Sequence, residues 1–227
     1  MKLSILMPVY NEKGTIREIL KKTEDCNLGD IEKEIIVVDD CSRDGTRDIL
    51  KEIKTHKVFF HDVNKGKGAA IQTALIHATG DIVVCQDADL EYEPNDLKKM
   101  VELFKNPEIK VVYGSRFLNM GEVKAMYTHY MGNKFLTFMT NLLFGAKITD
   151  METCYKMVRR DILKDIPLES KRFEIEPEIT AKLLKRKLKI QEVPISYNYR
   201  SFEEGKKITL FDGVRALYYL LKYRFKN

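Results

Sequence analysis

The sequence contains few cysteines and no long apolar run, and each shortage argues against a class of protein. Its four cysteines form no CxxC pair and do not cluster with histidines, which argues against a disulfide framework or a zinc site. No uninterrupted apolar stretch reaches the roughly 18 residues of a membrane-spanning helix. The amino-terminal apolar run follows a lone lysine and lacks a cleavage site, so it predicts a first strand, not a signal peptide, and a cytoplasmic protein.

The bulk composition is that of one folded domain. The 227 residues suffice for a sizeable core, and 44% hydrophobic with 32% charged residues is typical of a folded chain. The net charge of +5 is too small to indicate nucleic-acid binding. No internal repeat or linker divides the sequence, so we expect residues 1–227 to form a single domain.

Short apolar segments alternate with helical patterns through the first half of the chain. We expect strands at residues 3–9, 34–38, 58–60, 82–85 and 111–113, and helices at 15–23, 46–53, 68–77 and 97–104. The second half adds helices at 126–144, 178–187 and 208–225 and a strand at 190–199. Apolar strands between amphipathic helices predict an α/β protein with a mostly parallel sheet, covered by helices on both faces.

Polar side chains gather where the predicted strands end. In an open parallel sheet, ligands bind at the carboxyl ends of the strands. The clusters that follow the five predicted strands are Tyr10, Asn11 and Glu12; Asp39 and Asp40; residues 64–68; Asp87, Asp89 and Glu91; and residues 114–116. The sequence therefore predicts a binding site at this edge of the sheet.

The segment QDADLE, after the fourth predicted strand, carries three carboxylates. Alternation along an extended segment places Asp87, Asp89 and Glu91 on one side, where their charges repel unless a cation lies among them. Mg²⁺ and Mn²⁺ prefer such oxygen ligands, and either ion would also hold a diphosphate. The same pattern also fits an exposed acidic turn before a helix.

Two further loops have ligand-binding patterns. Asp39 and Asp40 precede a polar loop, which suits hydrogen bonds to a base or ribose, while later residues of that loop suit helix capping. The glycine-rich turn NKGKGAA leads into a helix and can approach an anion with its backbone N–H groups, which makes Lys67 a candidate for donor contact. The alternative for this turn is close packing of the helix start on the sheet. It is not a P-loop, because GxxxxGK[ST] is absent.

Eight motifs follow one another along nearly the whole chain. They are PVYNE (8–12), VVDDCSRDGT (37–46), NKGKGAA (64–70), QDADLEYEP (86–94), GSR (114–116), TDMETCYK (149–156), FEIEPE (173–178), and YR with GKK (199–200 and 205–207). In this order and spacing the chain resembles the inverting family 2 glycosyltransferases, and within them the dolichyl-phosphate mannosyltransferase-like, polyprenyl-phosphate branch. The resemblance implies a GT-A fold, which is Rossmann-like, and a hexosyltransferase that uses a nucleotide sugar and Mg²⁺ or Mn²⁺.

The resemblance also implies roles for single residues. The residues that would line the nucleotide pocket are Pro8, Tyr10, Glu12, Asp39 and Asp40, and those that would hold metal and diphosphate are Asp87, Ala88, Asp89 and Glu91. Many family members have glutamine at the position of Glu91. Arg116 would face the acceptor phosphate. Arg200 and Lys206 match a basic pair that closes over the donor diphosphate, although Gly205 stands where the family has serine.

The implied reaction is displacement at the anomeric carbon with inversion. Charge on the leaving nucleoside diphosphate would be offset by the metal, Arg200 and Lys206. A hydroxyl acceptor needs a carboxylate base, and Asp150 is the candidate for it, whereas an ionised lipid phosphate needs none. In that case Asp150 would orient groups, and as a further alternative it is only a turn residue. The candidate catalytic residues are Asp89, Asp150, Arg116 and Arg200.

Two segments of the second half suit a membrane surface. Residues 121–146 are rich in Phe, Met and Leu, and residues 207–227 are basic and amphipathic, so both are candidate membrane-surface helices of a peripheral protein at the cytoplasmic face. The alternatives are packing on the domain core, contact between copies in a homo-oligomer, or an integral-membrane partner. The expected ligands are a donor (GDP-mannose, UDP-glucose or UDP-N-acetylglucosamine) and a polyprenyl or dolichyl phosphate acceptor.

Three other functions stay open on sequence grounds. A family 2 transferase of the same fold would also suit a soluble glycan, protein or small-molecule acceptor. A nucleotidyltransferase usually has a glycine-rich signature near its amino terminus, where this chain has PVYNE. A non-catalytic nucleotide-sugar-binding protein would not need Asp87, Asp89, Arg116 and Arg200 together.

Overall fold

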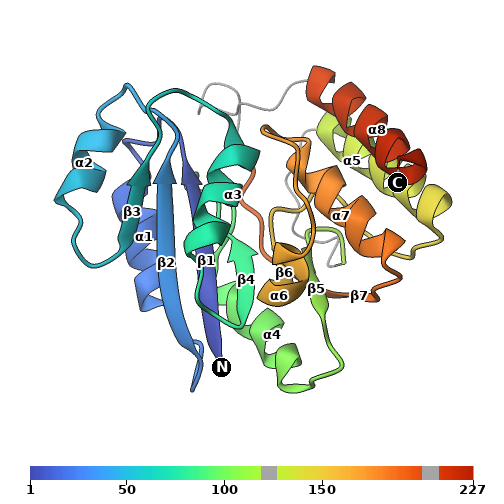
Figure 1. Ribbon diagram of the computed structural model, residues 1–227, viewed down its shortest axis with the longest axis horizontal. Coiled ribbons are helices and arrows are strands. Elements are labelled where there is room, and N and C mark those ends of the chain that lie inside the picture. Colours follow the sequence, from blue (N-terminus) through green and yellow to red (C-terminus); the bar gives the residue numbers. More distant parts are fainter. Residues whose placement is uncertain (119–126, 201–209, 227) are drawn as a thin grey trace.

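The computed structural model describes residues 1–118, 127–200 and 210–226. They fold around one seven-stranded sheet (Figure 1). In sheet order the strands are β3 (Lys57–Phe60), β2 (Glu32–Asp39), β1 (Lys2–Val9), β4 (Ile82–Cys85), β6 (Lys156–Arg159), β5 (Val111–Ser115) and β7 (Ile190–Pro194). The helices are α1 (Ile16–Asp25), α2 (Thr46–Glu52), α3 (Lys67–His77), α4 (Leu97–Val101), α5 (Tyr127–Phe144), α6 (Arg160–Lys164), α7 (Ile175–Lys185) and α8 (Leu210–Phe225). Short 3-10 turns, η1 (Pro94–Asp96) and η2 (Glu102–Lys105), flank α4.

The predicted, mostly parallel sheet is confirmed. Only β6 among the described strands runs antiparallel to its neighbours, β4 and β5. The sequence gives no sign of β6, because two of its four residues are basic and it is too short to show an alternating pattern. The strand predicted at 190–199 is too long: it ends at Pro194, and beyond it Tyr197 forms an isolated bridge to Tyr92.

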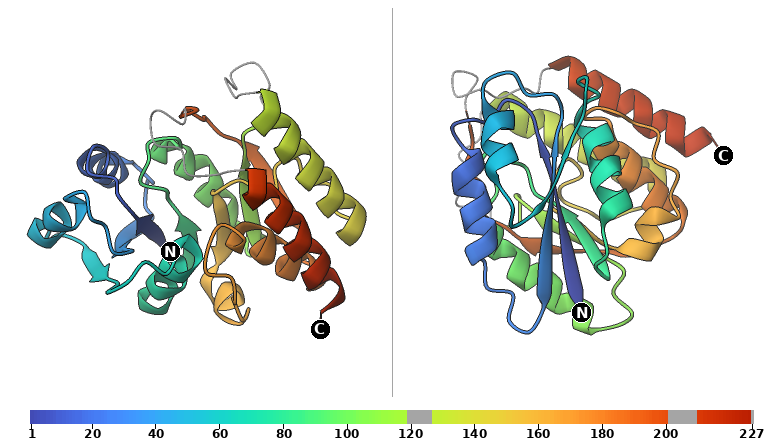
Figure 2. Two further views of the ribbon diagram at one scale, coloured as in Figure 1. Left: turned by 90° about the horizontal axis from the view of Figure 1, so that it is seen from above. Right: turned by 60° about the vertical axis from the view of Figure 1, so that its left-hand side comes forward.

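Helices cover both faces of the sheet (Figure 2, left). α1 and α4 lie on one face, and α3 and α6 lie on the other. Between these layers, β1, β2, β4 and β5 contribute runs of buried apolar side chains to the main core. Such near-continuous apolar strands are expected where a sheet is covered on both sides.

The helices α5, α7 and α8 gather at the β7 end of the sheet, and α8 packs against both of the others (Figures 1 and 2). A second apolar cluster joins them: Leu136, Ile148, Met151, Ala181, Ala216, Leu220 and Tyr223. α5 and α8 therefore bury one face against the domain. Within the described ranges, no helix combines the length and the apolar character needed to cross a bilayer.

Backbone strain marks the carboxyl edge of the sheet. The loops after β1, β2 and β4 each contain a non-glycine residue in the left-handed region: Asn11 (φ 51°), Cys41 (φ 65°) and Leu90 (φ 64°). These conformations cost energy and persist where surrounding contacts fix them, which is frequent at functional sites. This edge is also where the sequence predicts the ligand site.

Candidate active site

A pocket of about 460 Å³ opens at the carboxyl edge of the sheet. Its lining comes from segments far apart in the sequence: Pro8, Val9, Tyr10, Glu12, Asp40, Asn64, Gly66, Lys67, Ala70, Asp87, Ala88, Asp89, Glu91, Arg172, Phe173, Arg200 and Asp212. Most of the predicted site residues are in this set. Asp39, Arg116 and Asp150 are not, and Lys206 lies outside the described residues.

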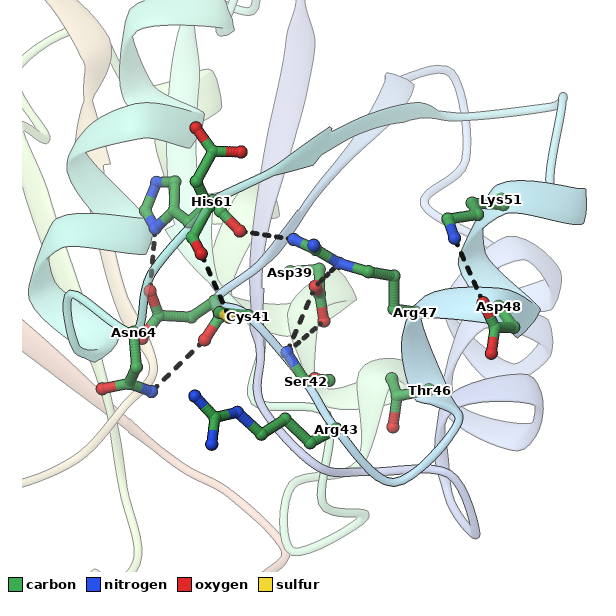
Figure 3. Close-up of polar contacts among 12 residues, drawn as sticks. Asp39, Cys41, Ser42, Arg43, Thr46, Arg47, Asp48, Lys51, His61 and Asn64 are labelled. Carbon is green, nitrogen blue, oxygen red and sulfur yellow. Dashed lines mark hydrogen bonds and ion pairs between the residues drawn. The ribbon is translucent and has the colours of Figure 1, made fainter.

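Asp39 ends β2 and is fully buried. Its carboxylate accepts hydrogen bonds from the backbone N–H of Ser42 at 3.3 Å and from Nε of Arg47 at 2.8 Å (Figure 3). Arg47 also donates to the backbone carbonyl of His61. Asp39 thus ties the loop after β2 to α2 and, through Arg47, to the end of β3, and its contact with a nucleotide stays a prediction.

Asp40 follows Asp39 and lines the pocket. Its carboxylate accepts the backbone N–H groups of Lys65 at 2.8 Å and Gly66 at 2.7 Å, and it lies 2.8 Å from Nδ1 of His61. The side chain of Asn64 donates to the Asp40 carbonyl oxygen at 3.2 Å. Asp40 therefore shapes the glycine-rich turn that precedes α3.

Two glycines bring this turn against residues 170–172. A Cβ on Gly66 would lie 2.4 Å from the carbonyl oxygen of Lys171, and a Cβ on Gly68 would lie 2.4 Å from that of Ser170. Gly66 also has a φ of 96°, which side chains disfavour. The turn is therefore closely packed, but these two glycines meet the loop before α7 and not the sheet, which the alternative interpretation had expected.

The acidic loop after β4 concentrates negative charge in the pocket. Asp87 and Asp89 are half-buried and Glu91 is buried. Burial, followed by the charges of Asp87 and Glu91, raises the pKa of Asp89 to about 7. Protein groups therefore leave part of this charge uncompensated. Carboxylate oxygens are the ligands that a hard divalent cation such as Mg²⁺ or Mn²⁺ prefers. In the described part of the chain, however, these three carboxylates do not form a group whose ligand atoms all lie within 4.8 Å of one another, so their shared binding of a cation stays a prediction.

A chain of ion pairs continues from Asp87 into the interior. Nζ of Lys67 lies 2.8 Å from the carboxylate of Asp87 and 3.2 Å from that of Glu176. Nζ of Lys156 lies 2.5 Å from the other oxygen of Glu176. Nothing in the local pattern indicates that Glu176 pairs with Lys156, because the two lie in separate motifs and meet only in the folded chain. Together these pairs hold Lys67 and Asp87 in fixed positions at the pocket wall.

Arg200 reaches the pocket from a distant part of the sequence. Its Nη1 and Nη2 donate to the two oxygens of Glu12 at 3.0 and 3.1 Å, and its backbone N–H donates to Glu91 at 3.1 Å. The bridge between Tyr197 and Tyr92 holds the preceding segment against the acidic loop. Residues of the first, fourth and last predicted motifs therefore converge at one place.

Arg116 and Asp150 form a buried pair. Nε and Nη2 of Arg116 donate to the two Asp150 oxygens at 2.7 Å, and the backbone N–H of Arg116 donates to the same carboxylate at 3.1 Å. The guanidinium also faces the ring of Tyr197 at 5.1 Å. The two predicted catalytic residues are thus coupled to each other, and their contact with an acceptor stays a prediction.

Two thiols lie close to Asp87. The ligand atoms of Cys85, Cys154 and Asp87 are all within 4.8 Å of one another, although the two cysteines are far apart in the sequence. Thiols suit Zn²⁺, whereas Mg²⁺ and Mn²⁺ prefer oxygen. This group is therefore distinct in chemistry from the predicted oxygen site.

Several pocket residues had no predicted role. Arg172 and Phe173 come from the loop before α7, and Asp212 comes from α8. The sequence feature that could have indicated a site here is the neighbouring basic and aromatic pair, Arg172 and Phe173, at the start of the FEIEPE motif. That this pair lies at the pocket could be recognised only in the folded chain, where residues 170–172 pack against the glycine-rich turn.

The comparison with family models identifies the family of the chain. A model described as glycosyl transferase family 2 matches residues 4–167, which include the loops after β1, β2 and β4. The chain belongs to glycosyl transferase family 2. It is therefore a glycosyltransferase, and the pocket at the carboxyl edge is its candidate active site.

Curated members of the family resemble this glycosyltransferase along nearly its whole length. It is 32% identical to a UDP-N-acetylglucosamine–dolichyl-phosphate N-acetylglucosaminyltransferase of Methanococcus voltae, with 96% of this chain and 94% of that protein covered. It is 30% identical to a dolichol-phosphate mannosyltransferase of Pyrococcus furiosus, with 98% of this chain covered. The chain spans 64% of that second protein.

Solved structures agree on the fold. Glucosyl-3-phosphoglycerate synthase of Mycobacterium tuberculosis, in complex with UDP, matches with a TM-score of 0.76 at 19% identity, and covers 98% of this chain and 80% of its own. Other crystal structures of that enzyme contain UDP with Mn²⁺ or with Mg²⁺. This family 2 glycosyltransferase therefore has the GT-A fold that the sequence resemblance implied.

Proposed function

We propose that this glycosyltransferase transfers a hexose from a nucleotide sugar to a polyprenyl phosphate, with inversion and with a divalent cation. The observation that carries the proposal is the convergence of Glu12, Asp89 and Arg200 in one pocket from three distant segments. The names of the two relatives, at 32% and 30% identity, support the acceptor class.

The acidic loop would hold the cation. Asp87, Asp89 and Glu91 supply oxygen ligands, and the raised pKa of Asp89, due to burial and its acidic neighbours, fits a position that a cation completes. When bound, the cation would supply positive charge to the diphosphate of the donor. The ion pair of Asp87 with Lys67 fixes one of the three carboxylates in advance.

Donor binding would use both walls of the pocket. Pro8, Tyr10 and Asp40 line the side formed by the loops after β1 and β2, which the family resemblance assigns to the nucleotide. Arg200 is held in the pocket by Glu12 and would stabilise negative charge on the leaving diphosphate. Lys206 would add a second positive charge.

The Arg116–Asp150 pair supports a phosphate acceptor. Asp150 is fully buried and accepts three hydrogen bonds from Arg116, so its lone pairs are engaged. A carboxylate in this state is a poor general base, because abstracting a proton would require breaking a buried ion pair. An ionised phosphate attacks without such a base. Asp150 would then position Arg116.

The surface of α5 and α8 supports a lipid environment. Each helix exposes an apolar stripe at spacings of four, three and four residues: Met131, Phe135, Phe138 and Leu142 on α5, and Val214, Tyr218, Leu221 and Phe225 on α8. The two helices pack side by side and bury their other faces. Exposed apolar stripes with neighbouring lysines and arginines are typical of helices at a membrane surface. We include peripheral membrane binding in the proposal.

Ligand binding tests the first half of the proposal. Thermal unfolding would be followed with GDP-mannose, UDP-glucose and UDP-N-acetylglucosamine, each with and without Mn²⁺. One donor is expected to raise the Tm when Mn²⁺ is present, since a ligand that binds only the folded state stabilises it by mass action. If none of these donors raises the Tm under either condition, the donor assignment is wrong.

Product analysis tests the acceptor. The stabilising donor would be incubated with a polyprenyl phosphate in anionic vesicles, and separately with free sugars and phosphoglycerate. Transfer to the lipid with inverted anomeric configuration, measured by NMR, is the expected result. Transfer only to a soluble acceptor would support the alternative family 2 function. Flotation with the vesicles measures membrane binding independently of transfer.

A further inference from the structure

Arg172 lies at the pocket on a loop whose backbone is tightly fixed. The carbonyl oxygens of Lys171 and Ser170 accept hydrogen bonds from the backbone N–H of Ala69 (3.0 Å) and the side chain of Gln72 (2.8 Å). The contacts at Gly66 and Gly68 leave no room for a Cβ between the two segments. The contacts with the start of α3 therefore fix the backbone position from which the Arg172 side chain extends.

The guanidinium of Arg172 differs from the other cations of the pocket. Lys67 is paired with Asp87 and Glu176, and Arg200 is paired with Glu12. Arg172 is exposed and, among the described residues, has no ion pair or hydrogen bond to its guanidinium. Its positive charge is therefore available to a ligand.

The excess negative charge of the pocket explains why a phosphorylated ligand would need the Arg172 cation. The carboxylates that line the pocket include Glu12, Asp40, Asp87, Asp89 and Glu91, and a single divalent cation would neutralise only part of them. A phosphorylated substrate that enters such a pocket is repelled unless another cation meets it. Arginine suits this task, because its planar fork of donors matches two phosphate oxygens at once.

We propose that Arg172 binds a phosphate group of a substrate in the active-site pocket. The inference rests on the proposed function, which supplies two phosphorylated substrates, the diphosphate of the donor and the phosphate of the acceptor. Both present the same oxygen chemistry to a guanidinium, and the experiment separates them. Arg172 acts by binding, and no proton transfer is assigned to it.

Three variants test the role of Arg172. Arg172→Ala removes the cation, Arg172→Lys keeps the charge without the fork, and Lys171→Ala is a matched control that removes an exposed positive charge from the neighbouring residue outside the pocket lining. Calorimetry would measure the Kd of the preferred nucleoside diphosphate with Mn²⁺, the Kd of the corresponding monophosphate, and the Kd of a short-chain prenyl phosphate. Because the Arg172 side chain has no partner among residues 1–118, 127–200 and 210–226, all three variants are expected to melt within a few degrees of the wild type.

The expected result is a loss of affinity of about 10- to 100-fold in Arg172→Ala for one phosphorylated ligand, with a smaller loss in Arg172→Lys and none in Lys171→Ala. Weaker binding of the diphosphate alone assigns Arg172 to the donor, and weaker binding of the prenyl phosphate alone assigns it to the acceptor. If Arg172→Ala binds both ligands as tightly as Lys171→Ala does, the proposal is overturned while the function stands. Wild-type protein that binds neither ligand would overturn both.

Discussion

Carboxyl groups at the two ends of the sheet have pKa values shifted in opposite directions. At the amino end, Glu34 accepts hydrogen bonds from the hydroxyl of Ser4 at 2.6 Å and the backbone N–H of Thr79 at 2.7 Å, and pairs with Lys57 at 2.9 Å. Burial favours the neutral acid, but these hydrogen bonds outweigh it and hold the pKa of Glu34 well below its usual range. At the carboxyl end, burial and acidic neighbours raise the pKa of Asp89 to about 7.

The difference separates a carboxylate that the fold itself stabilises from one to which the proposed function assigns a role. Glu34 is satisfied by the protein itself, so the folded chain gains stability from its charge. Asp89 lies among like charges that the fold neutralises only in part, which costs stability and is typical of a site that a ligand completes. Substitutions at the two ends should therefore change different measurable quantities.

The largest effect is expected from Asp89→Asn. The variant loses a charge to which the proposed function assigns metal binding, so kcat/KM for sugar transfer should fall on the order of 10³-fold. The free energy of unfolding should stay the same or rise, because one of three crowded negative charges is removed while the shape is kept. Enzyme assay and urea unfolding measure the two quantities on the same sample.

Asp48→Asn is the matched control for Asp89→Asn. The Asp48 side chain is 78% exposed on α2 and outside the pocket, and among the residues that the structure describes it pairs only with the exposed Lys51. Activity and stability should both stay near the wild-type values. An Asp89→Asn enzyme that keeps most of its activity, or that unfolds far more easily than the wild type, would contradict a functional role for Asp89.

The second effect concerns the buried pair of Arg116 and Asp150. Asp150→Asn should lower the free energy of unfolding by about 3–5 kcal/mol, because the Arg116 cation would stay buried without its counter-charge. The double variant Arg116→Met/Asp150→Leu should lose less than the sum of the single variants, and urea unfolding of all of them measures the coupling.

The same variants bear on the acceptor. After correction for the folded fraction, the loss of kcat in Asp150→Asn should be smaller than in Asp89→Asn, because an ionised phosphate needs no base. A far larger loss at Asp150 would contradict the phosphate-acceptor mechanism and favour a hydroxyl acceptor.

The strands and helices that the sequence predicted correctly are those with a clear apolar pattern inside a single segment. The parallel strands β1, β2 and β4 each contain a run of apolar residues, and α1 has a clear apolar face, so these strands and this helix were recognisable. β6 was missed because its four residues KMVR owe their strand conformation to pairing with β4 and β5. In such a strand, tertiary pairing determines the structure and local propensity does not.

The same distinction applies to the site. The carboxylates of the acidic loop were recognisable because three of them lie within five residues of sequence. The ion pairs of Glu176 with Lys67 and Lys156 were not, and neither was the position of Arg172, because each depends on which loops meet across the sheet edge. The candidate ligand residues were therefore recognisable from the sequence, whereas the residues that hold them in position depend on the folded structure.

A smaller effect is expected at the amino end of the sheet. Glu34→Gln should lower the free energy of unfolding by about 1–3 kcal/mol at pH 7 and leave transfer activity unchanged, since Glu34 lies at the opposite end of the sheet from the pocket. The folded pKa of Glu34 is depressed, so its stabilisation is present above the unfolded value of about 4.3 and is lost as the pH falls below it. The difference between wild type and variant, measured by urea unfolding, should shrink in that acidic range. A difference that stays constant down to pH 3 would contradict this account.

The smallest effect separates the hydrogen bonds of Glu34 from its ion pair with Lys57, which shares the carboxylate oxygen with Lys2 at 3.2 Å. Lys57→Ala should cost only about 0.2–1 kcal/mol, because the Lys57 side chain is 44% exposed and water competes for its charge. Added salt should reduce that cost, whereas the cost of Glu34→Gln should depend less on salt, since most of its partners are neutral donors. If Lys57→Ala destabilises as much as Glu34→Gln does, the ion pair and not the hydrogen-bond network keeps this carboxylate charged. The contrast with Asp89 would then come from the charge of Lys57 alone and not from the hydrogen-bond donors around Glu34.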